Sequence, residues 1–188
     1  MFIYSMPVMK KATPILVLLL YCSLNSFSQA DTVYVDREYI YKENAVIQSV
    51  FLFAVCNEQD RPMYEQMLGI LRKQFAAAKV RTSSGIMDER VILDSIGNWM
   101  DRIRSSSMTM VLTLNKLTPA SFIDNRYAGD TTGKLLNASL TNNLPDDGAT
   151  VATIALYING ATAAPKGETA ARLLFRALSD HGFMPEKQ

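Results

Sequence analysis

The sequence holds few of the residues that most often carry out chemistry. Its 188 residues include two cysteines, Cys22 and Cys56, one histidine, His181, and one tryptophan. If Cys22 lies in a cleaved leader, a single cysteine remains and no intrachain disulfide can form. A single histidine leaves any histidine-based metal site dependent on carboxylates, and none recur at a ligand spacing around His181. We therefore predict no metal and no cofactor.

An excess of one charge is also absent. The chain has 19 Lys and Arg residues against 18 Asp and Glu residues. Residues 1–30 contribute two lysines and no acidic residue, so 17 basic and 18 acidic residues remain without them, a net charge of −1. Proteins that bind nucleic acid normally present a basic face. The composition therefore predicts no nucleic-acid partner.

Residues 1–30 have the pattern of an export signal. Lys10-Lys11 supplies the charged segment, residues 15–24 an apolar core, and Ser28-Gln29-Ala30 a small and polar end. The apolar core is much shorter than the roughly 20 residues of a membrane-spanning helix. We expect cleavage after Ala30 and no transmembrane segment in the mature protein, which would be periplasmic or secreted.

Cys22 allows a lipoprotein as the alternative. The residue before a lipidated cysteine is normally small, whereas Tyr21 stands there in this chain. Cleavage after Ala30 is therefore the favoured prediction. It leaves 158 residues, which is enough for one domain with one core.

The most apolar stretch of the mature chain is residues 46–56, which we predict to form a central strand. From Val50 to Val55 both alternating sets of side chains are apolar, as expected of a strand buried on both faces. Residues 31–45 have high β-propensity but carry charge in both sets. They suit an edge strand of the same sheet or an extended arm offered to a partner, and residues 46–188 form the domain.

Helical spacing follows the first strand. Asp60 precedes Pro62 as a candidate cap, and Met63, Met67 and later apolar residues predict a helix that ends near Lys79. Residues 79–82 are a short strand or a link. A second helix is predicted over residues 87–104, with Ile92, Ile96, Trp99, Met100 and Ile103 on its inner face.

The second half of the chain alternates between the two patterns. Residues 108–115 and 150–159 predict strands, and residues 118–123 a short helical turn. Leu136, Leu140 and Leu144 predict a third helix. The last helix begins near Pro165 and stops at Gly182, which would place Phe183 against Leu178 in a Schellman ending.

This order of elements predicts an α/β domain with a small, largely parallel sheet of three to five strands covered by helices. A two-layer α+β sandwich is the alternative, because the second and third strands alternate more than fully buried strands need to.

Two residues are weighed as catalytic candidates. Cys56 follows a strand and precedes a helix, a position where α/β proteins hold reactive groups. Glu58 and Asp60 lie beside it and favour the protonated thiol, so a packing role is the favoured interpretation. His181 lies at the end of the last helix, where its charge would complement the helix dipole. Nothing in the sequence pairs it with Cys56.

A glycine-rich segment, residues 129–135, superficially suggests a phosphate loop. Only three residues separate its glycines where four are needed, and Leu135 replaces the Ser or Thr that would hold magnesium. We therefore predict a solvated loop there.

One resemblance extends over much of the chain. The run Val50 to Leu71, with Asp60-Arg61-Pro62 after the strand, and the helix, strand and Ser121-Phe122 turn over residues 96–127 resemble the order of Toll/interleukin-1 receptor-type (TIR) domains. The resemblance implies a flavodoxin-like fold and, in some members, NAD cleavage by a helical glutamate. No glutamate lies between Pro119 and Pro145.

Two functional hypotheses follow. The favoured one is an exported, non-catalytic envelope module that binds a protein partner or a small ligand. The alternative is a small secreted enzyme, either a TIR-like domain that cleaves NAD or a hydrolase or transferase that uses the Cys56 thiol. A pocket with converging polar groups beside Cys56 would favour the enzyme.

Overall fold

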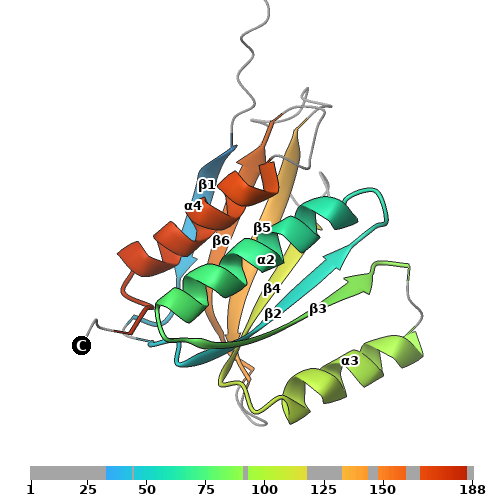
Figure 1. Cartoon of the computed structure of the whole chain (residues 1–188), viewed down its shortest axis with the longest axis horizontal. Coiled ribbons are helices and arrows are strands. Elements are labelled where there is room, and N and C mark those ends of the chain that lie inside the picture. Colours follow the sequence, from blue (N-terminus) through green and yellow to red (C-terminus); the bar gives the residue numbers. More distant parts are fainter. Residues whose placement is uncertain are drawn as a thin grey trace, which may run out of the picture. The chain divides into compact units, whose positions relative to one another are not determined.

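The structure is a computed structural model that describes residues 33–43, 45–90, 93–117, 133–143, 148–159 and 166–185. The predicted leader with Cys22 and Ala30, the turn at residues 118–123 and most of the glycine-rich segment lie outside these ranges. In the described ranges, a six-stranded mixed sheet has three helices packed against it (Figure 1), so the α/β class is confirmed.

The sheet has the strand order β1-β6-β5-β4-β2-β3. Strand β2 (Ser49–Cys56) pairs in parallel with β3 (Arg81–Asp88) and with β4 (Met110–Leu117). The other three pairings, β4 with β5 (Lys134–Asn142), β5 with β6 (Thr150–Ile158), and β6 with β1 (Val33–Ile40), are antiparallel. The prediction of a largely parallel sheet is therefore wrong, and so is the flavodoxin-like sheet that the TIR resemblance implies.

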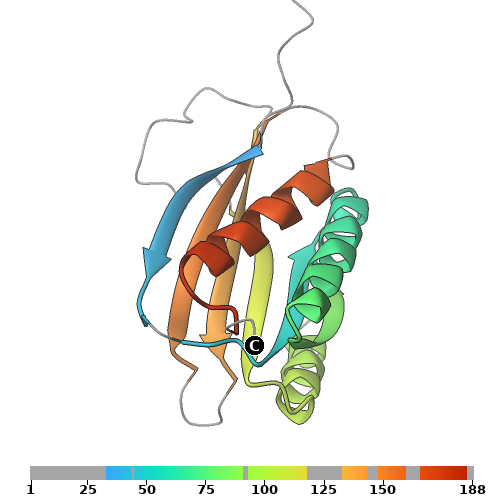
Figure 2. The ribbon, with the colours of Figure 1, turned by 60° about the vertical axis from the view of Figure 1, so that its left-hand side comes forward.

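Strand β2 is buried on both faces, as its sequence predicts. Val50, Leu52 and Ala54 pack under the helices α2 (Arg61–Ala77) and α4 (Lys166–Asp180). Phe51 and Phe53 face the opposite side, where helix α3 (Leu93–Ser105) covers them. Figure 2 shows α2 and α4 side by side on one face of the sheet, so the core is divided between two unequal layers.

The predicted third helix, carrying Leu136 and Leu140, is instead strand β5. Leucines four residues apart share one face of a strand as well as one face of a helix. Pairing decides between the two: Leu136 lies opposite Leu156, and Leu140 opposite Ala152. Leu144 lies outside the described residues.

The second helix begins later than predicted, because Met87 belongs to β3. Its inner face is also narrower than predicted. Ile103 is buried and Trp99 packs partly, whereas Ile96 and Met100 are 38% and 43% exposed. The side chain of Ile92 is not described.

Strand β3 explains the Ser-Ser-Gly sequence that suggested a break. A Cβ atom at Gly85 would lie 2.3 Å from Cζ3 of Trp99, so only glycine lets α3 approach the strand this closely. The ring centres of Trp99 and Phe53 are 5.4 Å apart. Gly85 therefore marks the contact between α3 and the sheet.

The last helix ends as predicted. Gly182 has φ +75°, and its N–H donates to the carbonyl of Ser179 at 2.9 Å. The N–H of Phe183 donates to the carbonyl of Leu178 at 3.0 Å, and both of these side chains are fully buried in one cluster. These are the bonds and the contact of a Schellman motif.

Candidate functional site

At the carboxyl end of β2, the side chain of Cys56 is buried in the domain. Cys56 is 3% exposed, and burial raises the pKa of its thiol to about 11, although the nearby Arg61 acts in the opposite direction. Acidic neighbours, Asp60 first, also raise it. A thiol of this kind is almost entirely protonated near neutral pH and is a poor nucleophile.

Asp60 lies at the start of α2 but does not cap it with its side chain. The carboxylate, 4% exposed, is paired instead with the ammonium group of Lys134 at the start of β5. The N–H of Asp60 donates to the Asn57 side-chain oxygen at 2.8 Å. The predicted cap residue thus ties a helix to a distant strand.

The surface beyond Cys56 is a shallow depression lined by Asn57, Glu58, Gln59 and Arg90. Arg90 binds Asp88 at 2.8 Å, and its hydrogen bonds lower the pKa of that carboxyl to about 2. Both groups are therefore held in an exposed ion pair and are not directed at a common point in a pocket. In the part of the chain that the structure describes, this geometry does not bring together beside Cys56 the converging groups that an enzyme needs.

His181 and Cys56 lie in different surroundings and are not paired with each other. The Nε2 atom of His181 lies 2.8 Å from Oε2 of Glu38 on β1, and its ring is tilted by 51° to the ring of Phe183, with ring centres 6.4 Å apart. Cys56, by contrast, is surrounded by Arg61, Asp60, Asp88 and Glu89. Within the described part of the chain, no three His, Cys, Asp or Glu side chains form a group that could hold a metal.

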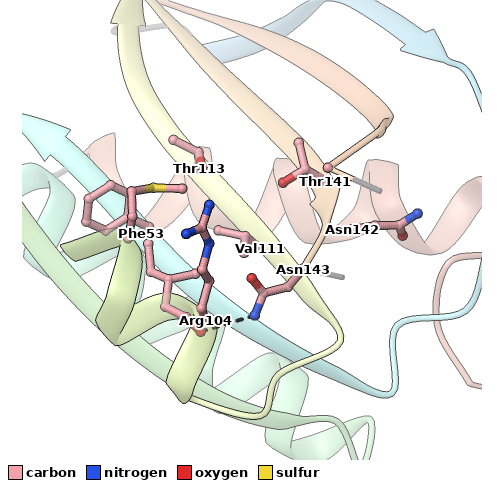
Figure 3. A pocket seen from close by; sticks show the side chains of 10 residues that line it. Phe53, Arg104, Val111, Thr113, Thr141, Asn142 and Asn143 are labelled. Atoms are coloured by element: carbon pink, nitrogen blue, oxygen red, sulfur yellow. Dashed lines mark hydrogen bonds between the residues drawn. The ribbon is translucent and has the colours of Figure 1, made fainter. Parts of the chain in front are cut away.

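A second, more enclosed groove lies between α3 and strands β4 and β5, on the face of the sheet opposite α2 and α4 (Figure 3). Its volume is about 520 Å³, within the usual range for binding sites. We call it the α3 groove. It is lined by Phe53, Met100, Ile103, Arg104, Val111, Thr113, Thr141, Asn142, Asn143 and Gly148.

The α3 groove has an apolar floor and a polar rim. Phe53, Ile103 and Val111 are nearly buried and form one cluster. The Asn143 amide donates to the carbonyls of Ile103 at 3.1 Å and Met108 at 2.9 Å, which holds the end of α3 against the sheet. Arg104, the one charged residue among the described lining residues, reaches from α3 toward β4 (Figure 3).

The described lining of this groove offers apolar and hydrogen-bonding contacts to a ligand. Among the described residues that line it there is no carboxylate, histidine, cysteine or lysine, and so these residues supply neither a general base nor a nucleophile of the usual kinds. Sequence reasoning missed the groove because its residues come from α3, β2, β4, β5 and the segment before β6, which only the sheet pairing brings together.

No helix in the described ranges is both long and apolar enough to span a membrane.

Comparison with known proteins gives a structural likeness alone. No family of known proteins matches the chain, and no curated protein matches its sequence. The PelC dodecamer from Paraburkholderia phytofirmans has a similar fold, with a TM-score of 0.50 and 14% identity over 82% of this chain and 100% of that one.

Two further structures are more distant. A point variant of the same PelC dodecamer has a TM-score of 0.47 and 14% identity, over 77% of this chain and 96% of that one. A PDZ domain protein from Parabacteroides distasonis has a TM-score of 0.46 and 7% identity, over 89% of this chain and 40% of that one. The chain therefore has an α/β fold that resembles the fold of PelC.

Proposed function

We propose that this chain is an exported, non-catalytic interaction module of the cell envelope that works as an assembly of identical copies. The observation that carries the proposal is the filled end of β2. Cys56 is buried beneath a shallow surface, where an enzyme of this fold class would present its reactive groups.

Two further observations support an interaction role. The α3 groove has the size of a binding site, and its described lining residues include no acid, base or nucleophile of the usual kinds. The similar fold of PelC is that of a dodecamer, so this arrangement of strands and helices is compatible with assembly. Export rests on the leader pattern of residues 1–30, which leaves residues 31–45 as an arm or edge strand and residues 46–188 as the domain.

The test is to express the full chain, fractionate the cells and measure the intact mass of the exported product. We expect the product in the envelope fraction, beginning at Asp31 or two residues earlier. The Cys56→Ala variant should retain every partner captured by the parent protein from envelope extracts. An uncleaved product confined to the cytoplasm, or loss of all partners in Cys56→Ala, would contradict the proposal. A product beginning at a lipidated Cys22 would overturn the soluble form and place the protein on a membrane.

A further inference from the structure

Strand β3 forms one margin of the sheet and lacks the features that prevent another strand from pairing with it. Its pairing with β2 runs without a shift over eight residues, from Arg81 to Asp88. Between these two terminal charges the strand has no charged residue, no proline and no bulge. Natural proteins normally protect such an edge, because its backbone N–H and C=O groups can pair with a second chain. The outer edge of β3 is therefore a candidate interface.

Strand β1, at the other margin of the sheet, is protected. A bulge interrupts its pairing with β6 between Val35 and Arg37. Asp36, Arg37 and Glu38 also place charged residues in the middle of the strand. A bulge and central charges both oppose pairing with a further strand. The two margins of this sheet therefore differ, and β3 is the one that is open to strand addition.

The backbone groups that β3 directs outward follow from its bonds to β2. The N–H of Arg81 donates to the carbonyl of Gln48 at 3.2 Å, so the backbone groups of Arg81 point toward β2. Along a strand these groups alternate in direction. The N–H and C=O groups that point away from β2 are therefore those of Thr82, Ser84 and Ile86. On that side of β3 the described part of the chain holds no further strand.

The helices near β3 pack on its faces. Side chains of a strand stand out of the plane of the sheet, whereas a further strand joins within that plane. On one face, the Cβ position of Gly85 meets the Trp99 ring of α3. On the other face, Ile86 packs against the cluster that α2 covers. Figure 1 shows β3 as the outermost strand, so these helix contacts leave the place of a further strand open.

The first end of β3 is basic. Lys79 and Arg81 are both exposed, and no carboxylate in the described ranges forms an ion pair with either. The guanidinium of Arg81 donates to the carbonyl of Ser107 at 2.8 Å, which holds the side chain in place and leaves its charge uncompensated. This end of the strand therefore carries two positive charges.

The second end of β3 is acidic. The carboxylates at this end are those of Glu58, Asp88 and Glu89. Arg90 binds Asp88 at 2.8 Å and is the cation among them, while the nearby Arg61 is paired with Glu65 at 3.0 Å. Glu89 is exposed and has no ion pair with a described residue. The edge of β3 thus runs from positive to negative, and it matches a second copy of itself in the antiparallel direction.

We propose that the β3 strands of two copies pair in the antiparallel direction about a two-fold axis at Ser84, so that two sheets become one. This inference rests on the proposed function, because it names the surface through which identical copies meet. Thr82 then lies opposite Ile86 of the second copy, and the outward backbone groups of both strands are paired. Beyond the ends of this ladder, Lys79 approaches Glu89 of the second copy. The contact is isologous, so it contains each of these pairs twice.

The first test is cross-linking of single-cysteine variants of the mature chain, with Cys56→Ala as background. Ser84→Cys should give covalent dimers with a short bifunctional thiol reagent, because the axis places the two Cα atoms about 5.5 Å apart. Tyr39→Cys, exposed on the protected strand β1, is the matched control and should stay uncross-linked. Equal yields from the two variants, or no covalent dimer from Ser84→Cys, would overturn the proposal.

The second test blocks the edge. Ser84→Pro removes an N–H that points away from β2 and places the proline ring where the second copy would pair. It should leave the chain monomeric with little change in the urea midpoint, because the ladder to β2 does not use that N–H. Ser84→Ala keeps the N–H and should still form dimers. A Ser84→Pro protein that associates as strongly as the parent would contradict the proposed contact.

Charge exchange is a third test, and it does not depend on whether the proline variant folds. Lys79→Glu should raise the concentration at which the dimer half dissociates by about threefold to tenfold, as expected for two exposed ion pairs. The double variant Lys79→Glu/Glu89→Lys should restore the parent value, because the exchanged charges again meet across the axis. Arg72→Glu makes the same charge change on the exposed side of α2 and should have no effect. A double variant weaker than Lys79→Glu would overturn the proposal.

These outcomes separate the interface from the proposed function. An oligomer that persists in Ser84→Pro would overturn the β3 contact and leave the assembly of identical copies intact. A parent chain that is monomeric at every concentration would overturn both.

Discussion

Asp60 and Lys134 form an ion pair that joins the start of α2 to the start of β5, 74 residues later in the chain. The Asp60 side chain is 4% exposed and that of Lys134 is 28% exposed. The pair fixes the helix that covers β2 to a strand on the far side of β4. A buried carboxylate without its partner is costly, whereas a pair replaced as a whole need not be.

Lys134→Met should therefore lower the free energy of unfolding by about 1–3 kcal/mol, less than for a fully buried pair because Lys134 is partly exposed. The double variant Asp60→Asn/Lys134→Met should lose less than Lys134→Met alone. Urea unfolding of the three proteins measures this. If the double variant is the least stable of the three, an unpaired Asp60 carboxylate is not the cause of the loss in Lys134→Met, and the explanation is contradicted.

Gly85 tests the packing of α3. Gly85→Ala places a methyl group 2.3 Å from the Trp99 ring and should cost about 1–3 kcal/mol. Gly97→Ala lies within α3 with nothing within 4 Å of the new methyl group, and should stabilise by roughly 0.5–1 kcal/mol. The same substitution thus has opposite signs at two sites. Tryptophan fluorescence should shift in Gly85→Ala alone, and equal midpoints would contradict the contact.

The end of α4 provides a third prediction. Leu178→Ala should cost about 2–5 kcal/mol, because the side chain is fully buried against Phe183. Gly182→Val should cost at least about 1–2 kcal/mol through backbone strain, since nothing lies near the new Cβ. Gly182→Asn should lose less, because asparagine tolerates positive φ. Equal losses for Val and Asn would show that the backbone is not the cause.

Cys56 predicts a specific dependence on pH. Its thiol has a pKa of about 11 in the folded protein against 9.0 as the reference, so its contribution to stability is complete below pH 9. As the pH rises from 9 to 11, the unfolded thiol ionises while the folded thiol does not, and stability falls. Burial also raises the pKa of Tyr64, which adds to this fall.

Cys56→Ala should therefore lose less stability between pH 9 and pH 11 than the parent protein. Native Cys56 should also react with an alkylating reagent far more slowly than free cysteine at neutral pH, and rapidly once unfolded. Fast labelling of the folded protein would contradict the buried position of the thiol.

Strand β2 and the strand over residues 150–158 could be predicted from sequence because alternation and burial agree there. Leu136 and Leu140 could not, since their spacing fits both a helix and a strand until a partner strand is known. Strand β3 was not predicted in full, because Gly85 suggested a turn. The glycine is instead required by the close approach of Trp99 to the strand. Helix α2 ends at Ala77, before the predicted Lys79, because Lys79 takes a left-handed φ of 60°. Such a helix end is usually marked by a glycine in the sequence, and none stands there.

The candidate site, like the fold, could be predicted from the sequence only in part. The sequence predicts an unreactive Cys56 from its acidic neighbours, whereas burial, which the sequence does not show directly, is the largest cause of the raised pKa of its thiol. Nothing in the sequence marks Arg104 as a binding residue. The groove that it lines forms only when Thr113 on β4 and Thr141 on β5 come together beside α3. The exposed Met100 had the spacing of a core residue, and only the narrow contact of α3 with the sheet leaves it at the surface.

The most direct measurement of the central claim is the native mass of the mature chain by light scattering across a range of concentrations. The account predicts an oligomer of defined mass that dissociates on dilution. A single species with the mass of one chain at every concentration would contradict it.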